Sequence, residues 1–548
     1  MESIVFVGIC GVSMTVLLVP RRWQYYFSLF LHVFLSLTGL SWAFRALLEG
    51  GTKIFPMLNG VGFLPVLTID SLSAYFILLV SFGMITAILY TGSYLKPYRK
   101  KRTRTQLGIH HLAFLWLHIS MLLVTVLRDG LFFLSAWEIM SLSLFGLFSF
   151  PADTSSSRLP AFNYLIQTQV GLLLLGGAMW YVHSLGYAFG LDGFEGYFAQ
   201  HSVLCLFIVL LIGFGISAGW VPLFLWLSPG HSIASAPVAG VLYGIGLKIG
   251  MYGLLRVLTN VHSDIYAVGA AVLAVSIASG IWGVLKASSQ TDINQFLTYH
   301  SIGNNGIIGL GIGAGLLGKA FQIADLAALA FTGSLLHIFN HSLFQSLLFY
   351  GAGAVSQSAH SLDLNQMGGL MKSMPKTAFF FLLGAASLCG IPPLNGFISE
   401  FLMVIGLFKG INATDDHVVM WSVGSLIVLV MISGWAIYHF AKAFFRIFLG
   451  VPRTIEASQA EETSENMLFS MLLTALPIVV IGLLPNFFIN RLAKVTDLYV
   501  SDTSSVRQAI PPFFFIGLSA VLFGIASFLL WQRCRPSKKE ILAEHPSS

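Results

Sequence analysis

Three ionisable residues lie inside long apolar stretches of the sequence. Glu138 stands near the middle of one stretch, Lys248 lies among glycines and aliphatic residues in another, and Glu400 follows a Pro-Pro pair in a third. A charge at the centre of a bilayer costs at least about 2.5 kcal/mol, so such residues usually mark ion pathways. Burial and neighbouring charges can switch a carboxylate or a lysine between its protonation states. We therefore predict a proton path through these three residues. The alternative is a structural ion pair inside the bundle for Glu138 and Lys248, and a helix-end carboxylate for Glu400.

Histidines supply a second group of candidates. His337 and His341 are four residues apart, on one face of a helix, which is a spacing that also suits two metal ligands. Because no third ligand is evident, we favour a proton relay over a metal site or purely structural hydrogen bonding. His300 opens the next apolar span upstream and is assigned to the same relay. His118 and His439 are interpreted as isolated, packed polar residues.

Membrane helices must position these side chains. Hydrophobic residues make up 56% of the 548 residues, charged residues only 9%, and the mean hydropathy is +0.82. A soluble protein carries about 25% charged residues. Apolar runs of about 20 residues recur from 3–19 to 511–531, long enough for a helix to cross a bilayer. The sequence predicts an all-α polytopic membrane protein with about 15 transmembrane helices.

The loops predict an orientation. Basic residues concentrate in alternate loops, above all in the segment 96–104, and acidic residues such as Glu49 and Asp192 in the others. We expect the protein to lie in the cytoplasmic (inner) membrane. Because positively charged loops remain in the cytoplasm, we expect its N-terminus outside and its C-terminus in the cytoplasm. The net charge of +6 is therefore not read as a nucleic-acid site.

Prolines interrupt two of the spans. Pro222 and Pro229 break the seventh, and Pro392 and Pro393 break the twelfth. Paired broken helices are typical of transporters built from inverted repeats. We predict two inverted five-helix repeats within four units: helices 1–3 (1–108), helices 4–8 (109–258), helices 9–13 (259–449), and helices 14–15 with the tail (450–548).

Motifs for catalysis or cofactor binding are missing from the sequence. The four cysteines are far apart, and the sequence contains no phosphate-binding loop, dinucleotide fingerprint or nucleophile elbow. We expect neither a cofactor nor a metal in this chain, so that any redox centre belongs to another subunit.

The region 68–449 resembles the antiporter-like subunits of respiratory complex I, membrane-bound hydrogenases and Mrp-type Na⁺/H⁺ antiporters. The wording Pro-Pro-Leu-Asn-Gly-Phe looks most like the large membrane subunit of hydrogenase-4 and formate hydrogenlyase complexes. The motifs that carry the resemblance are Trp-Glu-Ile-Met-Ser (137–141), Ala-Gly-Trp-Val-Pro-Leu-Phe-Leu-Trp-Leu (218–227) with Ala-Pro-Val (236–238), Gln-Thr-Asp-Ile (290–293), Tyr-His-Ser-Ile (299–302), Asn-His-Ser-Leu-Phe-Gln-Ser-Leu-Leu-Phe (340–349) and Gly-Ile-Pro-Pro-Leu-Asn-Gly-Phe (390–397).

The resemblance implies a role for each candidate. Glu138 would be the carboxylate of the first half-channel, and Lys248 would be the central connecting lysine. His337 and His341 would form the relay, and Glu400 would be the terminal carboxylate of the second half-channel.

Departures from the family pattern fall on both halves. Ser217 and Gln345 stand where the family usually has lysines, Phe224 where it has a histidine, and an Asn-Gln pair at 294–295 where it has two basic residues. A carboxylate–lysine switch near Glu138 cannot then work in its usual form. We also expect this sequence to lack the long lateral helix of some family members, since it continues only briefly after the predicted span 511–531.

Three functions remain open on the sequence. The first is a proton-translocating subunit (possibly Na⁺-translocating) of a redox-driven complex, with other membrane subunits and a peripheral redox arm as partners. The second is a Na⁺/H⁺ antiporter module of an Mrp-like complex without redox chemistry. The third is a membrane scaffold that has lost pumping, which the missing lysines favour and the three retained charges oppose.

Overall fold

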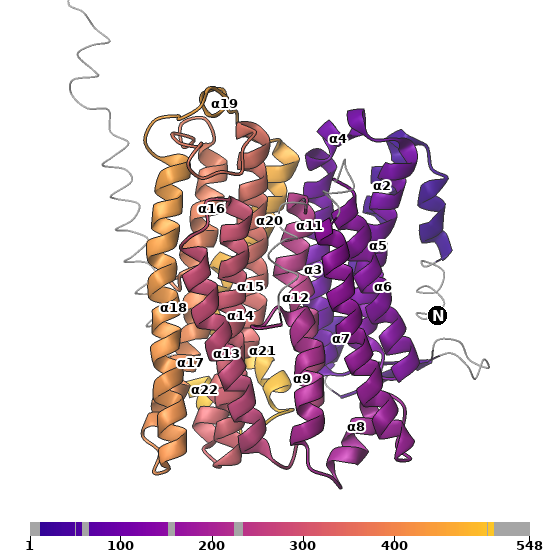
Figure 1. The fold of residues 1–548 in the computed structure, drawn as a ribbon, viewed down its shortest axis with the longest axis vertical. Helices are drawn as coiled ribbons and strands as arrows, with labels where there is room; N and C mark the ends of the chain where they lie inside the picture. The colour runs from indigo at the N-terminus through magenta and orange to yellow at the C-terminus, as the bar shows by residue number, and fades with distance from the viewer. Residues whose placement is uncertain are drawn as a thin grey trace, which may run out of the picture.

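The computed structural model is almost entirely helical (Figure 1). It describes residues 11–49, 51–56, 65–151, 159–223, 234–500 and 502–508. The predicted span 511–531, residues 3–10 of the span 3–19, and the residues Phe224 and Pro229 lie outside this part of the chain.

Ten helices of the described residues are long and apolar enough to cross a membrane. They are α2 (Arg21–Glu49), α3 (Ser71–Tyr94), α5 (Arg104–Val126), α6 (Gly130–Ser149), α7 (Leu159–Ser184), the continuous helix Ala236–Leu258, α13 (Ile265–Ala287), α15 (Ala324–Ala359), α18 (Asp416–Phe448) and α20 (Glu465–Leu483). Four more helices belong to the same bundle: α9 (Leu204–Ala218), α14 (Ile293–Ala320), α16 (Pro375–Leu388) and α17 (Asn395–Ile411). The all-α membrane fold is confirmed, whereas the count of 15 stays a prediction.

Short elements cover the two ends of the bundle. They are η1 (Met14–Leu17), the antiparallel pair β1 (Lys53–Pro56) and β2 (Val66–Ile69), α4 (Lys96–Lys101), α8 (Leu191–Phe198), α19 (Ile455–Ser458), α21 (Pro485–Thr496) and α22 (Ser504–Gln508). The end that carries α4 and α19, at the top of Figure 1, is called the basic end below. Helix α8 lies at the opposite end.

The centre of the bundle is the segment Ala236–Leu258 together with α15. This segment consists of α11 (Ala236–Val241), a π-helical turn η3 (Leu242–Gly246) and α12 (Leu247–Leu258), and every one of its residues is buried. At Gly250 an added Cβ would come 2.5 Å from the Ala218 backbone nitrogen, so only glycine allows α12 to approach α9 this closely.

Both predicted helix breaks are present where the structure describes them. Helix α9 runs toward the basic end and stops at Gly219, which has φ +73° and precedes Pro222. Helix α16 runs away from the basic end and stops just before Gly390, with φ +63°, and Pro392 and Pro393 follow. Each glycine adopts the left-handed conformation that ends a helix at no steric cost. The opposite directions of α9 and α16 agree with the predicted inverted arrangement, while the boundaries of the four units stay predictions.

Candidate functional site

Lys248 is completely enclosed at the centre of the bundle, with 0% of its surface exposed. It lies in the first turn of α12, directly after the wide turn η3, a kind of irregularity often found at functional sites. Its Nζ donates to Asn305 Oδ1 at 2.9 Å and to the Tyr243 carbonyl at 3.3 Å. Among the described residues no carboxylate forms a salt bridge with it. The structural ion pair that the sequence left open for this lysine is therefore not found in this part of the chain.

Asn305 of α14 links Lys248 to the first broken helix. Its Nδ2 donates to the Ala218 carbonyl at 2.9 Å, and its own carbonyl accepts from Trp220 Nε1 at 3.0 Å. The Ala218 carbonyl has no partner in its own helix because α9 stops at Gly219. The break thus supplies a backbone acceptor to the lysine's own hydrogen-bond partner.

A second hydrogen-bonded group begins at the residue of α14 that precedes Asn305. Asn304 Oδ1 lies 3.2 Å from His337 Nε2, and His337 Nδ1 lies 2.9 Å from Ser399 Oγ. The amide of Asn304 is oriented by its Nδ2, which donates to the His300 carbonyl at 3.0 Å. Its Oδ1 can only accept, so His337 Nε2 carries a hydrogen.

This arrangement satisfies His337 in both of its protonation states. Ser399 Oγ also lies 2.9 Å from the Gly396 carbonyl. When His337 is neutral, the Ser399 hydroxyl donates to Nδ1. When His337 is protonated, both ring nitrogens donate, and the hydroxyl can turn to the Gly396 carbonyl. A proton can be held here without leaving either nitrogen unpaired.

An amide pair fixes the second break next to this histidine. Asn340 Nδ2 donates to the Asn395 carbonyl at 2.7 Å and to Ser399 Oγ at 3.1 Å, and Asn395 Nδ2 donates back to Asn340 Oδ1 at 2.9 Å. Ser387, near the end of α16, donates to Asn395 Oδ1. These bonds hold the start of α17, and with it Ser399 and Glu400, against α15.

Glu400 lies directly after Ser399 and is 6% exposed. One carboxylate oxygen accepts from Ser433 Oγ of α18 at 2.8 Å, and the other has no partner among the described residues. An added Cβ at Gly390 would come 2.7 Å from Glu400 Oε2, so the carboxylate lies against the backbone of the second break.

The remaining histidines of the predicted relay are close to one another but not hydrogen-bonded. The rings of His337 and His341 are 6.4 Å apart, and both lie near enough to Lys248 to interact with its charge. The ring of His300 is 5.3 Å from that of His439. The ring nitrogens of His300, His341 and His439 are buried without a described partner. Steps through these residues would need intervening water.

His439 is therefore not the isolated residue that the sequence analysis expected. It lines a small pocket of about 20 Å³ together with Lys442 and Arg446 near the basic end of α18. That volume is enough for one water molecule. The interpretation of His118 as isolated was also wrong, because its ring stacks on that of His32 at 5.3 Å.

Glu138 differs from the other two charges. It is only half-buried and accepts a hydrogen bond from Gln169 Nε2 of α7 at 2.8 Å. Ser217, at the lysine position of the family pattern, is half-buried as well. Gln345, at the other such position, is fully buried and donates to the Leu297 carbonyl at 2.9 Å.

An ion network at the opposite end was missed by the sequence analysis. Asp70 caps α3 and forms salt bridges with Arg256 of α12 and with Arg128, the latter at 3.0 Å. Burial alone would raise the pKa of Asp70, but the two arginines and the Ser73 amide hold it below its usual range. The signal was available, because Lys248, Tyr252 and Arg256 recur every four residues on one face of α12.

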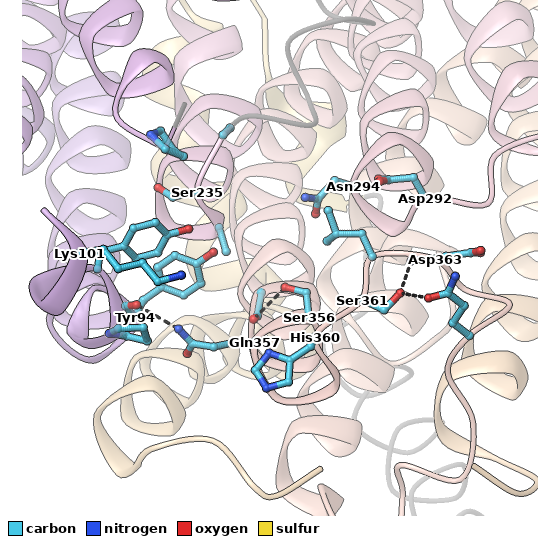
Figure 2. Close-up of a pocket in the computed structure, with 18 of the residues that line it drawn as sticks. Tyr94, Lys101, Ser235, Asp292, Asn294, Ser356, Gln357, His360, Ser361 and Asp363 are labelled. Carbon is cyan, nitrogen blue, oxygen red and sulfur yellow. Dashed lines mark hydrogen bonds between the residues drawn. The ribbon is translucent and has the colours of Figure 1, made fainter. Parts of the chain in front are cut away.

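A cavity of about 900 Å³ opens between the two halves at the basic end (Figure 2). Ser235, the residue before α11, lines it, and Asp292 and Asp363 lie across from Lys101 and Tyr94. Burial raises the pKa of Asp292, against the effect of its helix-capping hydrogen bond. Lys248 lies twelve residues along the helix from the start of α11, which is about 18 Å below this cavity.

No group of three or more potential metal ligands occurs in the described part of the chain.

Comparisons with known proteins agree with this geometry. The family "NADH:quinone oxidoreductase/Mrp antiporter, TM" matches residues 128–428. Hydrogenase-4 component B of Escherichia coli (strain K12) is 30% identical over 446 residues, which are 79% of this chain and 65% of that protein. Formate hydrogenlyase subunit 3 of the same strain is 36% identical over 276 residues, 50% of this chain and 45% of that protein.

The chain thus spans less than two thirds of the length of these curated relatives. A chain in the structure of the Mrp complex from Dietzia sp. DQ12-45-1b has the same fold, with a TM-score of 0.77 and 18% identity over 93% of this chain and 99% of that one. With its two broken helices, its buried lysine and a family match over more than half of its residues, the chain belongs to the NADH:quinone oxidoreductase/Mrp antiporter transmembrane family.

Proposed function

We propose that this chain is the proton-translocating, antiporter-like membrane subunit of a hydrogenase-like or NADH:quinone oxidoreductase-like complex. The observation that carries the proposal is the buried polar chain at mid-membrane, from Lys248 and Asn305 through Asn304, His337 and Ser399 to Glu400. A packed apolar bundle has no structural need for a lysine without a counter-ion. The names of the similar proteins, hydrogenase and formate hydrogenlyase subunits, support the kind of complex.

The proposed path starts at the cavity of Figure 2 and follows the segment Ala236–Leu258 down to Lys248. A proton that leaves Lys248 passes through intervening water to Nδ1 of His337, since Nε2 already carries a hydrogen bonded to Asn304, and then, with rotation of the Ser399 hydroxyl, toward Glu400. The driving event would be a charge change in another subunit, since the electrons belong to a redox arm outside this chain. Electrostatic coupling over such distances is effective because the protein interior screens charges weakly.

The half-buried Glu138 supports the assignment to a multi-subunit complex. A carboxylate of a membrane helix that is left partly uncovered by its own chain would face lipid unless another protein covers it. We propose that a neighbouring membrane subunit packs over α6 and α7 at this position. In the proposed orientation the basic end faces the cytoplasm, with the N-terminus outside and the C-terminus inside.

A Na⁺/H⁺ antiporter module is the second candidate, because the matched family covers both kinds of complex. The subunits that copurify with the native chain separate the two: hydrogenase or quinone-reductase subunits favour the first function, and small antiporter subunits the second. Dependence of transport on Na⁺ gives an independent answer.

Lys248→Met tests the proposed function directly. In the native complex, reconstituted in vesicles, we expect this change to lower proton transport by about 10²-fold or more, the usual contribution of a positioned proton-transfer group. Lys319→Met is the matched control. Lys319 lies at the C-terminal end of α14, away from Lys248, and among the described residues its Nζ donates to the Val261 carbonyl. Wild-type transport by an assembled Lys248→Met complex would contradict the proposed function and favour a membrane scaffold that has lost pumping.

A further inference from the structure

A second set of buried histidines lies away from the path between Lys248 and Glu400. His32 is on α2, and His110, His111 and His118 are on α5. All four are at most 3% exposed. Neither the proposed function nor the family resemblance uses them.

His32 and His118 form a pair at the level of the membrane centre. Their Nδ1 atoms are 3.1 Å apart, and their rings stack with an interplanar angle of 12°. Of two facing nitrogens, one must carry the hydrogen and the other the lone pair. In the neutral pair, one outer Nε2 atom therefore has a lone pair and the other a hydrogen. Both Nε2 atoms are buried without a described partner.

This pair can pass a proton with every bond accounted for. A proton binds the free Nε2 of the first ring, the shared hydrogen moves across the Nδ1–Nδ1 gap, and the second ring releases the hydrogen from its own Nε2. The net change is one proton moved, with the central hydrogen bond reversed. The starting tautomers return when the two rings rotate apart and each ring exchanges its hydrogen between Nδ1 and Nε2 with water on its own side of the pair.

Hydroxyl groups extend the polar surface along α2 in both directions. Ser28 and Ser36 lie four residues before and after His32, on the same face, and Ser81 of α3 lies against Gly39. All three hydroxyls are buried without a partner among the described residues. Many other buried hydroxyls in this bundle bond to a carbonyl of their own helix, as Ser120 does at 3.0 Å.

So many unpaired polar atoms in one helix interface indicate water. Each buried unsatisfied group costs about 1–3 kcal/mol, and native proteins avoid this by placing ordered water beside such groups. The orphaned atoms run from Gln24 Oε1 to Ser81 Oγ beside Gly39. That stretch of α2 is about 22 Å long, against about 30 Å for the hydrocarbon core.

At the basic end, this row of polar side chains approaches the surface helix α4. The ring of His111 lies 6.3 Å from that of Tyr25, and the Arg99 guanidinium of α4 lies over the Tyr25 ring at 5.7 Å. His111 also interacts electrostatically with His32 and with Arg99. Protonatable groups therefore follow one another from the surface helix α4 to the His32–His118 pair.

We propose that α2, α3 and α5 enclose a water-filled, histidine-lined proton column that runs from the basic end to the membrane centre, separate from the path through Lys248. Its ligand is the proton, carried by water and imidazole. Its part in transport rests on the proposed function, whereas its hydration does not.

Cysteine accessibility tests the hydration. In the native complex with the four natural cysteines replaced, Ser36→Cys is exposed to a water-soluble methanethiosulfonate reagent, and Ser120→Cys at similar burial serves as the control. Only a hydrated thiol forms the reactive thiolate, so we expect labelling of Ser36→Cys to be at least about tenfold faster. Equal, slow labelling of both variants would overturn the column.

Proton transport by the native complex in vesicles tests conduction. His118→Gln and His32→Gln each keep a hydrogen-bonding side chain but cannot hold a second proton, and we expect either change to lower transport about three- to tenfold. Ser120→Ala should leave it unchanged. Wild-type rates in both glutamine variants, with Lys248→Met inactive, would refute the column and leave the proposed function intact. Wild-type transport in Lys248→Met would instead refute the proposed function, while fast labelling of Ser36→Cys would still support the hydrated column.

Discussion

Glu138 and Glu400 occupy very different surroundings. Glu400 is enclosed by its own chain, bonded to Ser433 on one side and packed against the second helix break on the other. Glu138 is half-buried, and its hydrogen-bond partner, Gln169, is half-buried as well. A membrane carboxylate that its own chain encloses can complete a path alone, whereas one at the edge of the bundle needs a neighbour.

The hydrogen bonds show the same difference between the two halves. On the side of Glu400, side-chain bonds connect α14, α15 and α17 through Asn304, His337 and Ser399. On the side of Glu138, Ser217 stands at the family's lysine position, and among the described residues Glu138 accepts a hydrogen bond from Gln169. We infer that Lys248 communicates mainly with the second half, and that Glu138 acts at the boundary with another subunit.

The largest expected effect contrasts the two carboxylates. Glu400→Gln keeps the volume of the side chain but removes its proton chemistry, and we expect proton transport by the reconstituted complex to fall by about 10²-fold. Glu138→Gln should also lower transport, but by a smaller factor, because Glu138 is half-buried at the edge of the bundle, whereas Glu400 is enclosed directly after Ser399, the partner of His337. Assembly, measured as the yield of complex, should be normal in both variants. Greater loss in Glu138→Gln than in Glu400→Gln would reverse the comparison.

A smaller effect is expected from Ser399→Ala. This change removes the hydroxyl that lets His337 keep hydrogen bonds in both protonation states, a loss of about 1–1.5 kcal/mol that corresponds to roughly tenfold slower transport. Ser342→Ala is the matched control, since among the described residues the Ser342 hydroxyl donates to the Ile338 carbonyl of its own helix and not to a histidine. The pH profile of transport should also shift in Ser399→Ala and not in Ser342→Ala. Identical profiles would exclude Ser399 as a positioning residue for His337.

Sequence reasoning found the parts of this site whose polarity contradicts their surroundings. Lys248 and Glu400 were recognised because a charge inside an apolar span is costly, and the breaks at Pro222 and Pro392 because proline cannot continue a helix. Asn304 and Asn305 were missed, since a neutral amide barely changes the hydropathy of its span. Only the fold shows that Asn305 binds Lys248 and that Asn304, the residue before it, binds His337.

Contacts between distant segments explain the errors. His32 and His118 are 86 residues apart, and no local pattern indicates that α2 and α5 bring their rings together. The same holds for His300 and His439, on α14 and α18. Hydropathy placed the spans between 26 and 489 close to the described helices, but it carries no information on which face of each helix meets which neighbour.

The two positions where the family pattern has lysine should differ in assembly of the complex rather than in its transport rate. Gln345 is fully buried, bonded to the Leu297 carbonyl, and one helical turn after His341. Gln345→Lys would place an unpaired charge there, at a cost of several kcal/mol, so we expect a reduced yield of assembled complex. Ser217 is half-buried on α9, which packs against the helix that carries Gln169. Ser217→Lys should therefore assemble almost normally and gain an ion pair with Glu138, provided the two positions lie within about 10 Å, the reach of a lysine side chain. Normal assembly of Gln345→Lys together with failure of Ser217→Lys would show that the first half, not the second, is the more tightly closed.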